Sequence, residues 1–174
     1  AEGECTLAFQ GGEPTLAGLP FFQRVVELGE SLNVHRVRLH YAIQTNGYRL
    51  DEAWCSFFKE HQFLVGVSLD GPADLHNLNR PDAAGKNTFN QVMRSIALLL
   101  RFGVECQILC VLTGRCARSI DRVYRFFRKQ GFDHLQFIPC LEPLGQERGK
   151  ESYHLSVEEY GDFLIRLFDL WLED

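Results

Sequence analysis

The segment Gln10–Glu13 combines residue types that suit recognition of a small charged ligand. Gly11 and Gly12 lack side chains, so a ligand can approach their backbone closely. Gln10 offers both an amide donor and an acceptor, and the carboxylate of Glu13 can meet a cation such as an amino group. The segment therefore predicts a binding loop for the amine of an amino acid. A plain tight turn is the alternative, since Gly-Gly after a strand is a common turn signal.

Two other residues, much later in the chain, offer groups that complement this predicted amine-binding loop. Ser68 offers a hydroxyl at the end of an apolar run, and Arg80 can hold a carboxylate through two parallel hydrogen bonds. Arg80 lies in the segment Gly71–Asn87, which we expect to be a long loop. Each residue alone has an ordinary structural explanation, such as a surface ion pair for Arg80. Their joint occurrence with the glycine-rich segment favours a site for a zwitterion that carries both an amine and a carboxylate.

Five apolar runs alternate with helical segments and place these groups at one edge of a predicted sheet. The strands are expected at Cys5–Phe9, Val37–Ile43, Phe63–Ser68, Val104–Leu112 and Leu135–Ile138. Alternating strands and helices predict a parallel sheet with right-handed crossovers, in which ligands bind at the carboxyl ends of the strands. An open doubly wound sheet and part of a curved barrel both fit this order. A complete (β/α)8 barrel needs roughly 250 residues, so the 174 residues exclude it.

Capping signals mark where the helices begin. Asp51, Thr88, Ser119 and Ser156 each stand where a side chain can cap a helix. Thr88 and Ser156 are followed three residues later by Gln or Glu, as in a capping box. The last predicted helix carries an apolar stripe within Tyr160–Trp171, which we expect to lack a full cover in this chain.

Composition excludes several function classes. The net charge of −5 provides no basic patch of the kind that nucleic acid binding needs. No apolar run approaches the roughly 20 residues of a membrane span, and no signal peptide is visible.

The six cysteines are expected to be reduced thiols of a cytoplasmic protein. No common zinc spacing is matched by Cys106, Cys110 and Cys116, so we expect them to be buried small residues rather than metal ligands. We expect the histidines to lie at the surface or at helix ends.

A series of motifs resembles the radical S-adenosylmethionine (SAM) enzymes of the anaerobic sulfatase-maturating type and related enzymes that modify peptides. Phe9–Leu16 resembles their "GGE" element. Further landmarks follow in the family's order at Gln44–Gly47, Val67–Pro72, His76–Arg80 and Phe137–Glu142. The resemblance covers most of the chain, from its first predicted strand to the last of these landmarks.

The resemblance implies an α/β fold, namely a partial (β/α)6 TIM-like barrel of which this chain would contribute about five parallel strands and their helices. It implies a single domain over residues 1–174 that forms the central and C-terminal part of the barrel. It also implies that SAM is held by Gln10, by the backbone of Gly11, Gly12 and Glu13, by Ser68 and Arg80, and by Leu141 against the adenine.

One departure from the family pattern limits these expectations. The C-x3-C-x2-C loop that holds the [4Fe–4S] cluster in such enzymes is absent and is expected before Ala1, and the region of auxiliary clusters is expected beyond the C-terminus. We therefore expect the chain alone to be inactive, and we assign neither a metal ligand nor a catalytic residue in it. In the parent protein, a 5′-deoxyadenosyl radical would oxidise a cysteine or serine of a sulfatase polypeptide to formylglycine, with flavodoxin or ferredoxin as electron donor.

Two other functions are compatible with the sequence. The parent could modify another, ribosomally made peptide, because substrate choice would depend largely on the missing regions. The chain could instead be a degenerate barrel that serves as a binding or scaffold module. In either case the expected missing strand leaves an edge beside Cys5–Phe9, and exposed edges favour self-association.

Overall fold

The computed structural model describes residues 3–143 and 149–174. The chain folds into two compact units. The first comprises Ala1–Ser68 and Gln91–Gln107, and the second comprises Leu69–Asn90 and Ile108–Asp174. The strands follow one another in the order β1-β2-β3-β4-β5, which is also their order along the chain.

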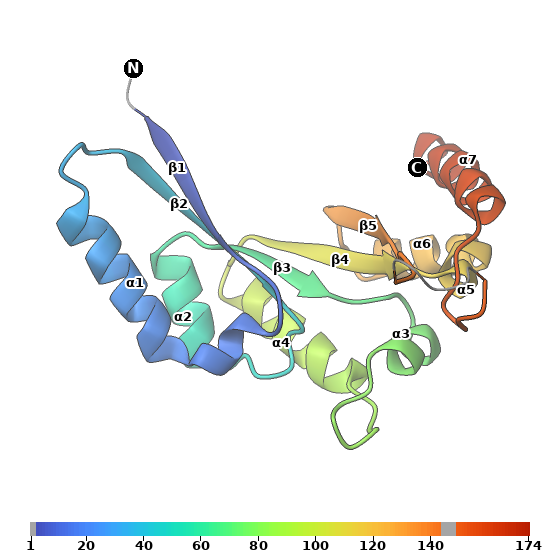
Figure 1. The fold of residues 1–174 in the computed structure, drawn as a ribbon, viewed down its shortest axis with the longest axis horizontal. Coiled ribbons are helices and arrows are strands. Elements are labelled where there is room, and N and C mark those ends of the chain that lie inside the picture. Colours follow the sequence, from blue (N-terminus) through green and yellow to red (C-terminus); the bar gives the residue numbers. More distant parts are fainter. Residues whose placement is uncertain (1–2, 144–148) are drawn as a thin grey trace. The chain divides into compact units, whose positions relative to one another are not determined.

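Three parallel strands form the sheet of the first unit. They are β1 (Glu4–Phe9), β2 (Arg38–Thr45) and β3 (Leu64–Ser68). Phe9 pairs with Ile43, and Thr45 pairs with Val67, so the carboxyl ends of the three strands lie at one edge. A 3-10 turn η1 (Pro14–Ala17) and helices α1 (Leu19–Leu32) and α2 (Glu52–Glu60) connect these strands (Figure 1).

An aromatic cluster packs the helices of the first unit onto its sheet. The ring of Phe22 in α1 meets that of Trp54 in α2 at a centroid distance of 5.4 Å. Phe58, also in α2, lies 5.3 Å from Phe63, which stacks at 5.1 Å on Tyr41 of β2. Because all five rings are buried, the cluster packs α1 and α2 tightly against the sheet.

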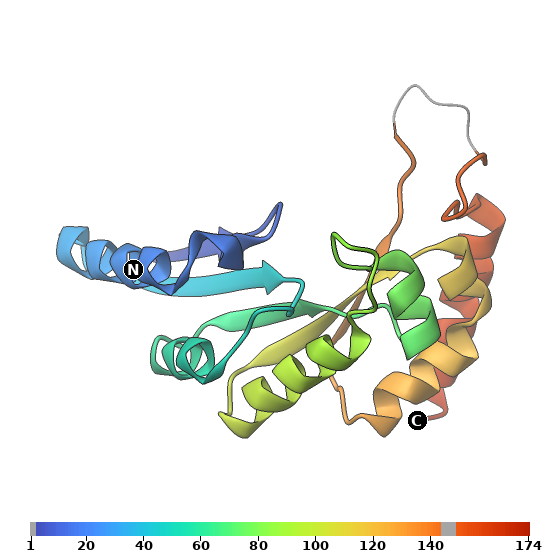
Figure 2. The ribbon, with the colours of Figure 1, turned by 90° about the horizontal axis from the view of Figure 1, so that it is seen from below.

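Two parallel strands and four helices make up most of the second unit. The strands are β4 (Cys106–Leu112) and β5 (Leu135–Pro139), and the helices are α3 (Ala73–Asn79), α5 (Gly114–Arg118), α6 (Ile120–Lys129) and α7 (Val157–Leu172). Helix α4 (Phe89–Arg101) begins in this unit and continues in the first, and the first two residues of β4 also belong to the first unit. Helices α6 and α7 lie side by side (Figure 2) and are joined by an ion pair of Arg166 with Asp121, which lowers the pKa of that carboxyl.

The structure confirms the five predicted strands and corrects several local details. The segment expected to be a long loop, Gly71–Asn87, contains helix α3. Ser156 forms the predicted capping box with Glu159, and Asp51 caps α2, whereas Ser119 stands at the N-cap of α6 without a side-chain capping bond. No helix in residues 3–143 and 149–174 is both long and apolar enough to cross a membrane.

Helix α7 exposes much of its apolar stripe, as the sequence predicts. Phe163 is buried, but Phe168 and Trp171 are more than half exposed, at 56% and 65% of their surface. Ile165 is exposed as well. Exposed neighbouring side chains of this size form the kind of surface that another chain segment or a second protein covers.

Candidate functional site

The carboxylate of Glu13 joins the turns that follow β1 and β2 in the first unit. Its Oε1 atom accepts hydrogen bonds from Thr15 N at 3.0 Å, from Thr15 Oγ1 at 2.7 Å and from Thr45 Oγ1 at 2.7 Å. Its Oε2 atom accepts one from Asn46 N at 2.7 Å. Four hydrogen-bond donors of the protein therefore already engage this carboxylate. The sequence led us to expect a carboxylate that meets the cation of a ligand instead. The carboxylate of Glu13 therefore holds the loop in shape.

The two glycines before Glu13 have the conformation that a backbone cradle requires. Gly11 and Gly12 have φ values of 85° and 57°, a region that residues with side chains rarely adopt. A Cβ atom added at either position would meet no heavy atom of the described residues within 4 Å, apart from its own chain neighbours. Gln10 directly follows β1, and Ser68 ends β3 at the same edge. The four residues of Gln10–Glu13 and Ser68 thus belong to one edge of the first unit.

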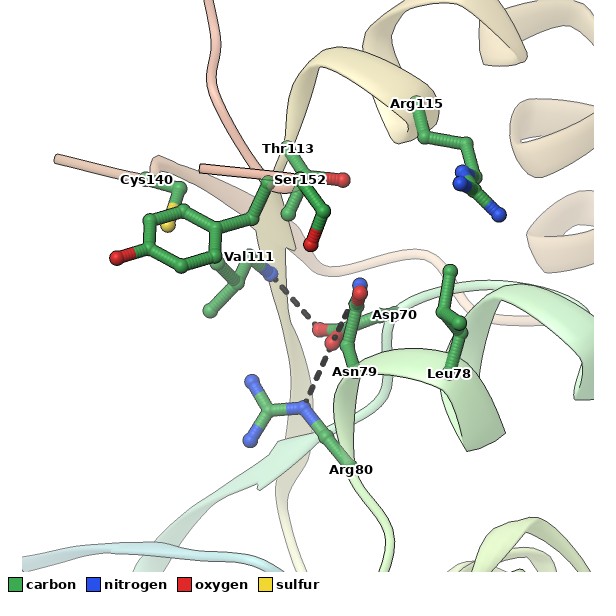
Figure 3. Close-up of a pocket in the computed structure, with 10 residues that line it drawn as sticks. Asp70, Leu78, Asn79, Arg80, Val111, Thr113, Arg115, Cys140 and Ser152 are labelled. Atoms are coloured by element: carbon green, nitrogen blue, oxygen red, sulfur yellow. Dashed lines mark hydrogen bonds and ion pairs between the residues drawn. The ribbon is translucent and has the colours of Figure 1, made fainter. Parts of the chain in front are cut away.

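Arg80 is the best-defined candidate residue of the second unit. Its Nε atom donates to Oδ2 of Asp70 at 2.8 Å, and the other oxygen of Asp70 accepts from Val111 N on β4 at 2.9 Å. The side chain of Asp70 is 1% exposed, whereas that of Arg80 is 26% exposed. Figure 3 shows the two terminal nitrogens of Arg80 pointing away from the carboxylate of Asp70. The buried carboxylate of Asp70 therefore fixes Nε of the guanidinium and leaves its two terminal nitrogens available for a ligand carboxylate.

A cavity of about 370 Å³ lies beside Arg80 at the carboxyl ends of β4 and β5. It is lined by residues of one unit only, namely Asp70, Leu78, Asn79, Arg80, Val111, Thr113, Arg115, Cys140, Ser152 and Tyr153 (Figure 3). Burial raises the pKa of the Cys140 thiol, with a further contribution from the negative charge of Asp70. That thiol is therefore protonated at neutral pH and is unsuited to act as a thiolate nucleophile.

Leu141 stands apart from this cavity in the second unit. It lies two residues after the end of β5 and is 85% exposed, and it is not among the residues that line the cavity. The neighbouring Cys140 N donates to Leu112 O at 3.0 Å, which continues the β4–β5 ladder up to this point. The residue just before Leu141 is thus held by the sheet, while Leu141 itself is open to contact.

Sequence reasoning missed Asp70 and misjudged His76. Asp70 precedes a glycine and reads as an ordinary turn residue, but its carboxylate is buried and holds Arg80. His76, expected to lie at the surface or at a helix end, is 0% exposed, and burial lowers the pKa of its imidazole to about 4. The available signal was the resemblance to the family, whose landmarks Val67–Pro72 and His76–Arg80 contain both residues without giving their partners.

Two of the three cysteines that the sequence predicts to be buried are fully buried in the structure. Cys110 and Cys116 are buried, with sulfur atoms 3.8 Å apart, and Cys106 is half-buried. Hydrogen bonding between the first two thiols and burial raise the pKa of Cys110 well above its ordinary value. Among the described residues, no three His, Cys, Asp or Glu side chains are grouped so that they could hold a metal ion. These residues therefore do not fit an iron–sulfur cluster.

The residues do fit SAM, in two groups that each lie within one unit. The glycine pair of the first unit presents bare backbone, and Arg80 of the second unit presents a fixed guanidinium beside a cavity. Backbone groups suit an amine, and a guanidinium suits a carboxylate, so each group by itself fits one of the two charged ends of the methionyl part of SAM.

Comparison with known proteins places these features in a family. Residues 3–127 match the model of the radical SAM superfamily. The whole chain is 49% identical to a cysteine-type anaerobic sulfatase-maturating enzyme of Clostridium perfringens, of which it covers 47%. Over 97% of its length it is 33% identical to a serine-type anaerobic sulfatase-maturating enzyme of Klebsiella aerogenes, of which it covers 41%. The chain thus spans about half the length of the curated relatives it matches.

A solved structure described as native anSMEcpe with bound AdoMet and Cp18Cys peptide matches the fold over the entire chain. The TM-score is 0.97 at 48% identity, and the match covers 48% of that protein. This likeness confirms the predicted fold class, a partial barrel with five parallel strands and alternating helices. The chain belongs to the radical SAM superfamily.

Proposed function

We propose that this chain binds SAM as part of an enzyme that oxidises a side chain of a sulfatase polypeptide to formylglycine. The observation that carries the proposal is the guanidinium of Arg80, whose Nε is held by the buried Asp70 while its terminal nitrogens face away from that acid. The similarity over the whole chain to sulfatase-maturating enzymes supports the choice of reaction.

The proposal assigns a role to each predicted site residue. Arg80 and Ser68 bind the carboxylate of SAM, and the backbone of Gly11–Glu13 with Gln10 binds its amine. The carboxylate of Glu13 keeps that loop in shape through its four hydrogen bonds. Leu141 contacts the adenine through backbone groups. With one electron from the proposed [4Fe–4S] cluster, SAM would supply the radical that abstracts a hydrogen atom, while this chain orients the molecule and excludes water from it.

The remaining partners are proposed for a longer protein that contains residues 1–174 as its central barrel segment. The ligands of a [4Fe–4S] cluster would lie outside the described residues, and flavodoxin or ferredoxin would deliver electrons. The six free cysteines support a reducing, cytoplasmic location. The greater identity to the cysteine-type relative, 49% against 33% for the serine-type one, supports cysteine as the oxidised residue.

The direct test is maturation of a sulfatase by the full-length protein in a host that lacks its own maturation enzyme. Mass spectrometry of the co-expressed sulfatase should find formylglycine in place of the target cysteine. Arg80→Gln should abolish the conversion, whereas Arg24→Gln, which alters a 66% exposed arginine paired with Glu27, should preserve it. An unmodified cysteine with the wild-type protein, or full conversion with Arg80→Gln, would contradict the proposal.

We also propose that the chain on its own self-associates through the exposed stripe of α7 and the edge strand β1. Phe168 and Trp171 offer apolar surface there, and β1 pairs on one side with β2. Size-exclusion chromatography with light scattering should show a mass that rises with concentration. A monomer throughout the concentration series would refute this part of the proposal.

A further inference from the structure

Four residues of the second unit form a closed circuit of hydrogen bonds that includes Arg80. The backbone N–H of Asp70 donates to Nδ1 of His76 at 3.3 Å, and Nε2 of His76 lies 3.1 Å from Oγ1 of Thr88. The hydroxyl of Thr88 donates to the carbonyl oxygen of Arg80 at 2.5 Å. The circuit closes where Nε of Arg80 donates to Asp70 at 2.8 Å.

Only one arrangement of protons satisfies every bond of this circuit. Nδ1 of His76 accepts from a backbone amide, so the imidazole proton must be on Nε2. Nε2 then donates to Thr88, and the proton of the Thr88 hydroxyl is left to the carbonyl of Arg80. The neutral imidazole that this requires agrees with the full burial of His76, which lowers the pKa of the ring, while the charges of Asp70 and Arg80 act on that pKa in opposite directions.

The circuit holds Arg80 at both its backbone and its side chain. Arg80 ends helix α3 with non-helical dihedral angles, φ −131° and ψ 56°, so the helix alone does not determine its direction. Its N–H donates to the carbonyl of His76 at 2.8 Å, and its own carbonyl is held by Thr88. Three separate bonds therefore fix the backbone and the Nε atom and leave the terminal nitrogens as the part that can meet a ligand.

The distribution of burial indicates what this arrangement is for. Asp70, His76 and Thr88 are exposed by 1%, 0% and 7%, and the side chain of Arg80 alone is appreciably exposed. Apolar residues would fill a buried space of this size without the need to satisfy each polar atom. A set of buried polar groups whose one exposed member lines a cavity is instead suited to hold that member in a single direction.

We infer that His76 and Thr88 are positioning residues, which orient Arg80 so that its guanidinium meets the carboxylate of SAM. This inference rests on the proposed function. A long arginine side chain loses rotamer freedom when it binds a ligand, and a circuit that restricts it beforehand reduces that loss. The loss of either positioning residue should therefore weaken the binding of a ligand that carries the carboxylate and spare one that lacks it.

The test compares SAM with decarboxylated SAM, which differ only in the carboxylate, by calorimetric titration of the full-length protein prepared without oxygen. Arg80→Gln should weaken SAM binding by at least about tenfold and leave the affinity for decarboxylated SAM unchanged. Thr88→Val, which replaces the hydroxyl with a methyl group, and His76→Phe should weaken SAM binding about tenfold with the same selectivity. Thr88→Ser keeps the hydroxyl and should restore the wild-type affinity.

The outcomes separate the inference from the function beneath it. If the wild type does not bind SAM, or if Arg80→Gln affects both ligands alike, the proposed function fails. If Arg80→Gln is selective but Thr88→Val and His76→Phe retain wild-type affinity or weaken both ligands equally, the positioning role alone is overturned. Should these two variants not fold, ¹⁵N NMR of wild-type His76 decides, because a proton on Nδ1 would refute the circuit and a proton on Nε2 would support it.

Discussion

Replacement of Asp70 by asparagine should destabilise the protein far more than the same change at an exposed acid. Asp70 is 1% exposed, and its two carboxylate oxygens accept from Val111 N and from Nε of Arg80. An asparagine has one acceptor oxygen and one NH₂ group in the same place. Whichever way it turns, its NH₂ group faces one of these two donors, and the negative charge is lost in both orientations.

The magnitude follows from these two losses. A hydrogen bond to a charged group contributes about 1.5–3 kcal/mol, here toward the lower end because the side chain of Arg80 is 26% exposed. The donor left facing the NH₂ group costs about 1–3 kcal/mol. We therefore expect Asp70→Asn to lower the free energy of unfolding by about 3 kcal/mol. With a urea dependence of about 2 kcal/mol per molar, the unfolding midpoint should fall by about 1.5 M.

Asp74→Asn is the matched control for this measurement. Asp74 lies four residues away in α3 and forms an ion pair with Arg122, but the two side chains are 62% and 53% exposed. An exposed pair of this kind contributes up to about 1 kcal/mol, so the control should shift the midpoint by less than about 0.5 M. Circular dichroism at increasing urea concentration measures both variants under the same conditions.

A double-mutant cycle with Arg80→Gln tests the cause of the effect. If Asp70 acts largely through Arg80, the cost of Asp70→Asn should be smaller by at least about 1 kcal/mol in the background that lacks the guanidinium. Equal midpoints for the Asp70 and Asp74 variants, or strictly additive effects in the cycle, would refute the assignment of Asp70 as the residue that holds Arg80.

Three further outcomes are expected. Glu13→Gln should lower the free energy of unfolding by about 2 kcal/mol in the same urea assay, since its amide group would face donors that the carboxylate now accepts from. The folded-state pKa of His76, about 4, lies below the ordinary 6.5, so stability should be complete above pH 6.5 and fall by about 3 kcal/mol toward pH 4. Urea midpoints of the wild type and of His76→Phe, measured across that pH range, isolate the contribution of His76 to the loss of stability. If the two midpoints changed with pH in parallel, this expectation would be contradicted. Gly47→Ala should cost more than Gly85→Ala in thermal unfolding, because both have positive φ but only the former would bring a Cβ within 2.9 Å of Val67.

Local chemistry was sufficient to predict several features of this protein from its sequence. Apolar runs located all five strands. The central residues of β3 and β4 are buried, as expected for continuously apolar strands, whereas β1 is largely exposed. Ser156 and Glu159 predicted a capping box that the structure contains, since both partners lie within one helical turn. Helix α3 was missed because Gly71 and Pro72 at its start, and Pro81 just after it, are typical of a loop.

What only the tertiary structure decided is the partner of each polar group. Thr88 reads as a helix cap, but its hydroxyl donates to the carbonyl of Arg80, and the carboxylate of Glu13 turns to the strand-end residue Thr45 rather than outward. His76 and Asp70 lie within motifs that the sequence singled out, but only the fold shows that burial makes one a neutral acceptor and the other the anchor of an arginine. The physical reason is that a polar side chain binds whatever donor or acceptor the fold brings within about 3 Å, and residues distant in the sequence set that neighbourhood.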